Sequence, residues 1–122
     1  MSNKLQILVV DDEPTIRELL TLALSEAGHE VTLASGGREG VQRAAENDYD
    51  LVLMDMDMPD WDGRRVLAAI RQDKPELKVL VVSAVRNPDL QGLMAEYPNV
   101  VGWLSKPFEL KVLYQQIADA VA

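Results

Sequence analysis

Acidic, hydroxyl and amino side chains stand at the ends of several apolar runs in this sequence. In chain order they are Asp11 and Asp12 after the first run, Asp55 after the third, Ser83 after the fourth and Lys106 after the fifth. Carboxylates that crowd together repel one another, and a cation between them relieves that repulsion. Oxygen ligands without histidine or cysteine favour Mg²⁺ or Mn²⁺ over zinc. The residue types therefore predict a magnesium or manganese site that handles phosphate.

Asp55 is the candidate nucleophile of this site. A carboxylate can attack a phosphoryl group and form an acyl phosphate. A metal ion and the Lys106 ammonium would offset the negative charge of the phosphoryl oxygens. Ser83 would donate a hydrogen bond, and the small Ala84 side chain would leave the approach open.

These residues need strands whose ends meet at one edge. Five β-rich apolar runs are the candidate strands: Leu5–Val10, Glu30–Ala34, Leu51–Met54, Val79–Val82 and Val100–Leu104. The third and fourth do not alternate between apolar and polar residues, so both of their faces must be buried. Helices on both faces of a parallel sheet provide such burial. The carboxyl ends of parallel strands share one edge, where sites form in open sheets.

Helical spacing of apolar residues marks the segments between these strands. The first helix should begin near Pro14 and end before Gly28. The fourth should end early at Tyr97-Pro98-Asn99. The remaining helices are expected after Ser35-Gly36-Gly37, after Asp62-Gly63 and after Pro107, and Asn87-Pro88 announces the fourth. Alternating strands and helices predict a doubly wound α/β sandwich with right-handed crossovers.

Composition limits the class of protein. The 122 residues, 48% hydrophobic and 26% charged, predict one globular domain over residues 1–122. The absence of cysteine excludes disulfides, thiolate zinc sites and a cysteine nucleophile. A net charge of −8 opposes direct binding to nucleic acid or anionic lipid. Neither a secretory signal nor a membrane-length apolar run is present, so we expect a cytoplasmic protein.

Five motifs in order give the sequence a family resemblance. They are Asp11-Asp12, Asp55, Met58-Pro59 with Gly63, Ser83-Ala84 and Lys106-Pro107-Phe108. Over nearly the whole chain this order resembles the response-regulator receiver domains of two-component signalling. The resemblance implies a flavodoxin-like (βα)5 fold with strand order 2-1-3-4-5. It also implies a phosphoprotein that carries 4-aspartylphosphate at Asp55.

The resemblance also implies roles in metal binding. Asp12 and Asp55 would bind Mg²⁺ directly, Asp11 would bind it through water, and Asp57 would contribute its backbone carbonyl. We further hypothesise that the side chain of Asp57 tunes hydrolysis of the acyl phosphate.

Contacts to the phosphoryl group follow from the same resemblance. Ser83 and Lys106 would touch that group, and the Lys106–Pro107 peptide bond would be cis. Trp103 stands where the family usually has a Tyr or Phe that rotates, so Ser83 and Trp103 would form the switch. The usual Gly-Ala turn before the fifth strand is replaced at 96–99, which predicts a short or shifted fourth helix.

The implied partners are those of a signalling protein. A histidine kinase or phosphotransfer protein would supply the phosphoryl group, and the chain would assist its own phosphorylation and dephosphorylation without being an enzyme. An output domain or protein would contact the surface formed by the fourth helix, fifth strand and last helix. A homodimer that forms on phosphorylation is an alternative.

Other interpretations compete with this one. Asp55-Met56-Asp57 looks like the acid pair of haloacid dehalogenase phosphatases, although that family places the pair after its first strand. A pseudo-receiver that is never phosphorylated is a second rival, although every acceptor residue is present. Asp12 or Glu13 could simply cap the first helix.

Some residues are better explained by simple structural roles. The methionines at 54, 56 and 58 are expected to fill the core or line a pocket rather than bind a soft metal. His29, the single histidine, is expected to be an exposed turn residue.

Overall fold

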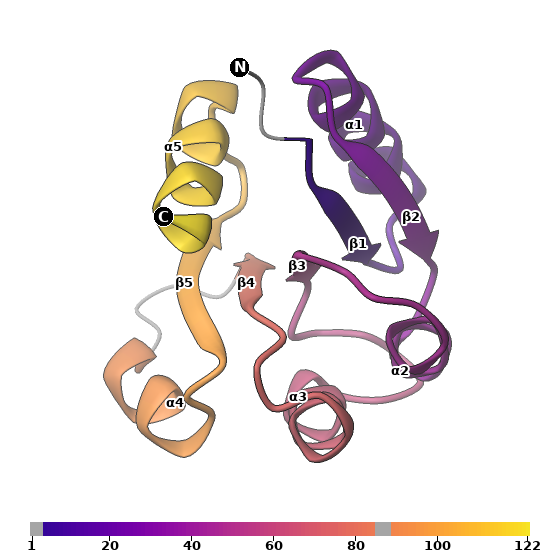
Figure 1. Ribbon diagram of the computed structural model, residues 1–122, viewed down its shortest axis with the longest axis vertical. Helices are drawn as coiled ribbons and strands as arrows, with labels where there is room; N and C mark the ends of the chain where they lie inside the picture. The colour runs from indigo at the N-terminus through magenta and orange to yellow at the C-terminus, as the bar shows by residue number, and fades with distance from the viewer. Residues whose placement is uncertain (1–3, 85–88) are drawn as a thin grey trace.

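A five-stranded parallel sheet forms the centre of the protein (Figure 1). The computed structural model describes residues 4–84 and 89–122. The strands are β1 (Gln6–Val10), β2 (Glu30–Ala34), β3 (Leu51–Met54), β4 (Val79–Ser83) and β5 (Val100–Ser105). Their spatial order is β2-β1-β3-β4-β5, which confirms the predicted fold class and strand order.

The register of the strands brings the predicted site residues to one level. Val10 at the end of β1 pairs with Met54 at the end of β3. The next residues continue the ladder, because the Asp55 amide donates to the Val10 carbonyl over 3.0 Å. Likewise the Lys106 amide donates to the Ser83 carbonyl over 2.8 Å. Asp55 and Lys106 therefore start from fixed backbone positions.

Five helices connect the strands. They are α1 (Pro14–Glu26), α2 (Gly37–Glu46), α3 (Gly63–Asp73), α4 (Leu90–Glu96) and α5 (Leu110–Val121). α1 and α5 cover one face of the sheet, and α2, α3 and α4 cover the other (Figure 1). α4 has only 7 residues, which confirms the early stop predicted there. Asn87 and Pro88, which were predicted to announce this helix, lie outside the described residues.

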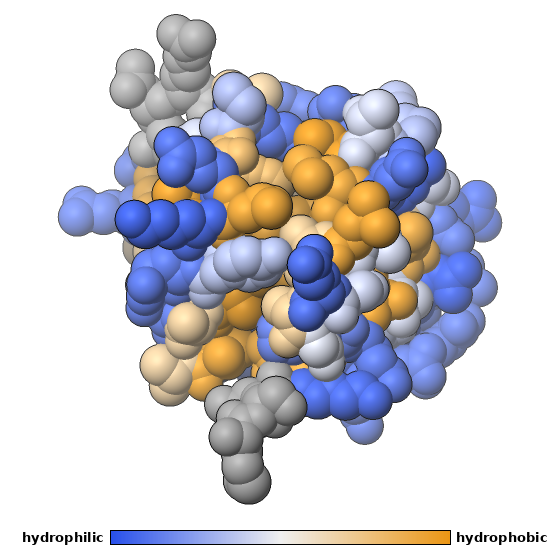
Figure 2. Space-filling view, turned by 90° about the horizontal axis from the view of Figure 1, so that it is seen from above, coloured by the Kyte–Doolittle hydropathy of each residue, from blue (hydrophilic) through white to orange (hydrophobic). Residues whose placement is uncertain are grey.

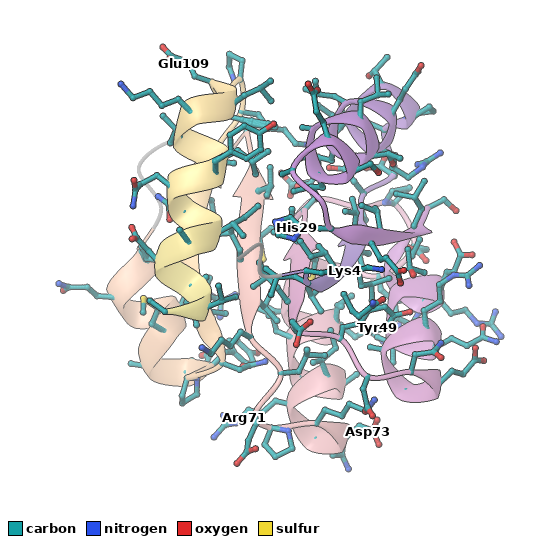
Figure 3. The ribbon with its side chains drawn as sticks, turned by 45° about the horizontal axis from the view of Figure 1, so that its top comes forward. Lys4, His29, Tyr49, Arg71, Asp73 and Glu109 are labelled. Carbon is teal, nitrogen blue, oxygen red and sulfur yellow. The ribbon has the colours of Figure 1, made fainter. Side chains whose placement is uncertain are left out.

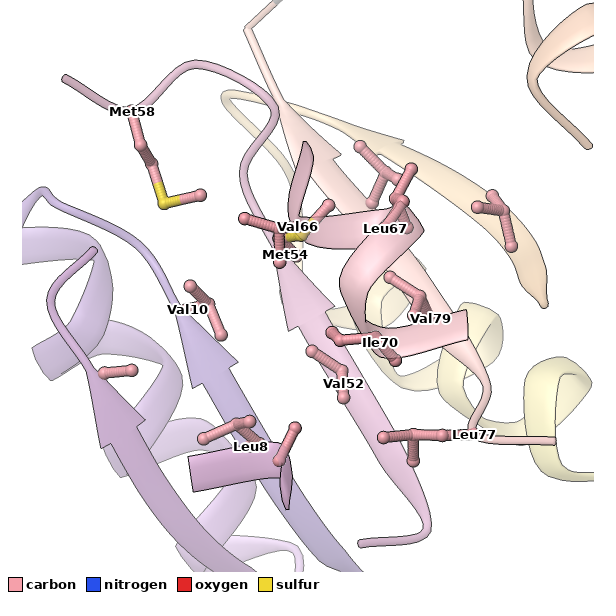
Figure 4. Close-up of a cluster of buried hydrophobic side chains, with 14 of the residues drawn as sticks. Leu8, Val10, Val52, Met54, Met58, Val66, Leu67, Ile70, Leu77 and Val79 are labelled. Carbon is pink, nitrogen blue, oxygen red and sulfur yellow. The ribbon is translucent and has the colours of Figure 1, made fainter. Parts of the chain in front are cut away.

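Each face of the sheet has its own apolar core. The core under α2, α3 and α4 contains Val52 and Ile70, and Figure 4 shows these side chains between the sheet and α3. Met54 and Met58 are buried in this core and Met56 packs against it, which confirms that the methionines are fillers. The core under α1 and α5 is separate. Seen from that side, apolar side chains also gather on the surface (Figure 2), with contributions from Leu19, Leu22, Leu110, Val112 and Tyr114.

His29 is not the exposed turn residue that the sequence predicted. Its ring is partly buried, and its Nδ1 accepts a hydrogen bond of 3.1 Å from the Leu5 amide, beside the start of β1 (Figure 3). Gly28 has a φ of 95°. This left-handed conformation suits glycine and closes the end of α1. The His29 amide then donates to the Leu24 carbonyl, so the chain turns tightly and the ring reaches Leu5, the residue before β1.

Candidate functional site

Three carboxylates meet at the carboxyl edge of the sheet. One oxygen from each of Asp11, Asp12 and Asp55 lies within 4.8 Å of the others. Asp11 and Asp55 are buried and Asp12 is partly buried. All the donors in this group are hard oxygen atoms, which suit Mg²⁺ or Mn²⁺. The predicted acidic cluster is therefore present, and it is able to bind a metal.

Lys106 neutralises much of this negative charge. Its ammonium lies 2.8 Å from Asp11 Oδ2, 3.0 Å from Asp55 Oδ2 and 3.0 Å from Glu13 Oε1. Burial by itself lowers the pKa of Lys106, but the hydrogen bonds that its ammonium donates to the three carboxylates outweigh this effect and raise the pKa. Lys106 therefore stays protonated and holds the acidic side chains together.

Asp11 is the most enclosed acid of the site. Its Oδ1 accepts from the Glu13 amide over 2.9 Å, and its carbonyl accepts from Arg17 over 2.7 Å. Burial raises the pKa of Asp11, and the hydrogen bond from Lys106 offsets only part of that effect. A second cation beside Asp11 would relieve the remaining cost of its charge.

Asp55 has both carboxylate oxygens in use. Oδ2 faces Lys106, and Oδ1 accepts from the Asp57 amide over 3.1 Å. The residue is 5% exposed, whereas Asp57 is exposed. The two hydrogen bonds fix the direction of the Asp55 carboxylate.

The loop of residues 55–63 is anchored by an acid that sequence reasoning missed. Asp60 accepts from the amides of Gly37 and Arg38, over 3.0 and 3.1 Å, and so caps α2 from another part of the chain. The amides of Arg38, Trp61 and Gly37, in that order of effect, lower the pKa of Asp60. A Cβ at Gly36 would lie 2.9 Å from Asp60 Oδ2, so the close approach needs glycine there. The capping residue is 23 positions from Gly37, which local patterns do not reveal.

Glu13 does not make the helix-capping contact that the sequence suggested for it. It occupies the N-cap position of α1 but makes no side-chain cap hydrogen bond. Its carboxylate instead points to Lys106. The hypothesis that Glu13 caps α1 is therefore wrong, because the buried ammonium is a stronger partner for a carboxylate than an amide.

The remaining predicted residues lie along β4 and β5. Ser83 is buried at the end of β4, Ala84 is exposed, and the Lys106–Pro107 peptide bond is cis as predicted. Trp103 is partly buried against the core under α2, α3 and α4. Within the described part of the chain, its buried Nε1 has no hydrogen-bond partner.

Comparisons with known proteins agree on one family. Residues 7–118 match the family described as response regulator receiver domain. The chain is 35% identical over 123 residues to the transcriptional regulatory protein GlrR of Escherichia coli, covering 99% of this chain and 27% of that protein. It is 38% identical over 116 residues to the DNA-binding transcriptional regulator NtrC of Rhizobium meliloti, covering 95% and 24%. The chain thus spans about a quarter of the length of these relatives.

A solved structure supports the same relationship. The response regulator protein TrrA of Thermotoga maritima, in complex with Mg²⁺ and BeF, superposes with a TM-score of 0.83 at 33% identity. The match covers 97% of this chain and 99% of that one. Among the described residues, no helix is both long and apolar enough to cross a bilayer.

Proposed function

The chain belongs to the response regulator receiver family, and we propose that it accepts a phosphoryl group on Asp55. The observation that carries this proposal is the buried Asp55 carboxylate, held by Lys106 beside Asp11 and Asp12. A receiver domain implies a histidine kinase as its partner. The family match from 7 to 118 further supports one receiver domain over the whole chain.

In the proposed reaction, an Asp55 carboxylate oxygen attacks the phosphorus of a phosphohistidine. The new O–P bond forms while the P–N bond breaks, and the imidazole leaves with the electron pair and takes up a proton. Lys106 stays charged and donates to a phosphoryl oxygen. Ser83, buried at the end of the neighbouring strand, is the proposed hydroxyl donor.

A metal ion fits the carboxylate group of this site. Asp12 and Asp55 would hold Mg²⁺ directly, Asp11 through water, and Asp57 by its carbonyl. When bound, Mg²⁺ supplies positive charge that offsets the phosphoryl oxygens. The partly buried position of Asp12 supports this assignment, because it leaves a path for the ion from solvent.

The proposed output is a shift between two conformations. Phosphorylation would draw Ser83 toward the phosphoryl group, and Trp103 would move in response. Among the described residues Trp103 Nε1 has no hydrogen-bond partner, and this supports such a switch, because a buried N–H gains free energy by moving to a partner. Exposed apolar side chains at Met94, Leu110 and Val112 support an output partner or a second copy at α4, β5 and α5.

Phosphorylation of the purified chain tests this function. Acetyl phosphate and Mg²⁺ should add one phosphoryl group, seen by intact mass, and Asp55→Asn should abolish it. Asp57→Asn is the matched control, because it makes the same change two residues away and should still be labelled, with an altered rate of loss. Phosphorylation of Asp55→Asn would contradict the proposal. So would phosphorylation of the wild type that is unchanged when a chelator removes Mg²⁺.

Phosphatase activity of the haloacid dehalogenase type is the rival function. The acid pair Asp55 and Asp57 follows β3 here rather than the first strand. Turnover of a phosphate ester by the wild type would favour this rival over the receiver function.

A further inference from the structure

The ammonium of Lys106 is fully engaged before any phosphoryl group arrives. A protonated lysine has three N–H donors. Three carboxylate oxygens lie within 3.0 Å of Nζ, from Asp11, Glu13 and Asp55. While Asp55 is still a carboxylate, a phosphoryl oxygen of the incoming donor that takes a hydrogen bond from Lys106 must therefore replace one of these three oxygens.

The three carboxylates differ in how easily they can leave. The side chains of Asp11 and Asp55 are 2% and 6% exposed, whereas that of Glu13 is 51% exposed. Asp11 keeps its charge throughout, and Asp55 keeps its charge until its O–P bond forms. If either of these buried carboxylates lost the ammonium while the donor approaches, it would be left with an unpaired charge away from water, which is costly. A half-exposed carboxylate exchanges the ammonium for water at little cost. Glu13 is therefore the partner that can be released.

Within residues 4–84 and 89–122, Lys106 is the one anchor of the Glu13 side chain. Glu13 stands between β1 and α1 in an extended conformation, with a φ of −87° and a ψ of 114°, and makes no cap bond to α1. Its carboxylate can swing into solvent without breaking the helix. Its backbone amide, in contrast, stays bonded to Asp11 Oδ1.

We propose that Glu13 occupies, in the resting protein, the place at Lys106 that a phosphoryl oxygen takes on phosphorylation. Glu13 is thus a positioning residue that keeps Lys106 in register with Asp55 and restrains phosphorylation until a phosphoryl donor displaces it. This inference rests on the proposed function of Asp55.

Glu13→Gln tests the proposal, because a neutral amide binds the ammonium less strongly than a carboxylate does. The rate of phosphorylation by acetyl phosphate at saturating Mg²⁺ should rise by about two- to fivefold, the range expected for a half-exposed ion pair. The affinity for beryllofluoride, a stable phosphoryl analogue, should rise by a similar factor. Glu109→Gln is the control, because Glu109 lies at the start of α5 without a side-chain cap bond (Figure 3) and carries the same charge.

Glu13→Asp separates competition for Lys106 from a general effect of charge. Aspartate keeps the negative charge but is one methylene shorter, so it should not reach Nζ. If Glu13 acts by competition, Glu13→Asp should also speed phosphorylation and tighten beryllofluoride binding. The inference would be overturned if phosphorylation were faster in Glu13→Gln but not in Glu13→Asp. It would also be overturned if Glu109→Gln were equally fast, or if neither Glu13 variant were faster than the wild type. Failure of the wild type to be labelled at all would instead refute the proposed function.

Discussion

Two regions beside the same sheet are held in place by different forces. One is the acidic site at the ends of β1 and β3, and the other is the helix α4. At the strand ends, Asp11, Asp55 and Lys106 are buried and bonded to one another at 2.8 and 3.0 Å. In α4, Leu93 is the single buried residue, and the helix has 7 residues. The hydrogen bonds that Arg64 and Arg71 of α3 donate to Glu96 at the end of α4 are exposed. One region is assembled before its ligand binds, and the other is held weakly.

This difference suits the two parts of the proposed function. Phosphoryl transfer needs charged groups whose positions are already fixed, because fixed groups need no rearrangement during the reaction. A conformational output needs a segment that moves at low cost, and such segments have few buried apolar side chains. We propose that α4 and the neighbouring Trp103 form that segment, whereas the acidic site does not.

The largest expected effect comes from removing the ammonium at the acidic site. Lys106→Met should cost about 3 kcal/mol in the free energy of unfolding at pH 7, because buried carboxylates lose their partner. It should also slow phosphorylation strongly. Urea denaturation and intact mass measure the two effects, with the exposed Lys111→Met as control.

The pH dependence of this variant has a definite sign. The folded-state pKa of Asp11 is already raised, and it should rise further without Lys106. A group with a raised pKa favours the protonated folded state, so the stability it gives is lost as the pH rises through that pKa. The loss in free energy of unfolding caused by Lys106→Met should therefore shrink as the pH falls below 7. A deficit that stays constant would show that the lost packing, not the charge, is responsible.

A smaller and more local effect is expected in α4. Leu93→Ala should cost about 2 kcal/mol, the low end for a buried leucine, because a short surface helix can adjust around the change. Hydrogen exchange should speed up in α4 while the amides of β1 and β3 stay protected, and Asp55 should still be phosphorylated. Leu67→Ala, in the core under α3, is the control and should speed exchange throughout the sheet. If Leu93→Ala and Leu67→Ala reduced the exchange protection of β1 equally, α4 would not be held more weakly than the acidic site.

The smallest expected effect tests the anchor of the loop beside Asp55. Asp60→Asn should cost about 0.5 kcal/mol at pH 7, because asparagine keeps an acceptor oxygen for the amides of α2 but loses the charge that favours a helix N-terminus. The pKa of Asp60 is lowered in the folded state, so its stabilisation is present above the unfolded pKa and is lost as the pH falls through the folded one. The difference from wild type should therefore narrow below about pH 4.

The matched control for this change is Asp62→Asn. Asp62 caps its own helix, α3, through the Arg65 amide at 2.9 Å. Hydrogen exchange at Gly37 and Arg38 should quicken in Asp60→Asn and stay unchanged in Asp62→Asn. Unchanged exchange in both variants would show that Asp60 does not hold the loop to α2.

The sequence alone determined the scaffold and most of the candidate site. Non-alternating runs such as Leu51–Met54 require burial on both faces, and strand ends in a parallel sheet share one edge. Those rules were enough to predict that Asp11, Asp12 and Asp55 meet. Pro98 similarly predicted the early end of α4, because proline acts on the chain beside it.

Only the tertiary structure decided which partner each polar side chain takes. Glu13 could cap α1 by its position, but a buried ammonium 93 residues away binds it instead. Asp60 caps a helix that begins 23 residues earlier, and the His29 ring accepts from the Leu5 amide, 24 residues before it and just ahead of β1. Apolar spacing acts through neighbours in the sequence and can be read locally. Hydrogen bonds depend on distances of about 3 Å, and across long separations only the folded chain sets those distances.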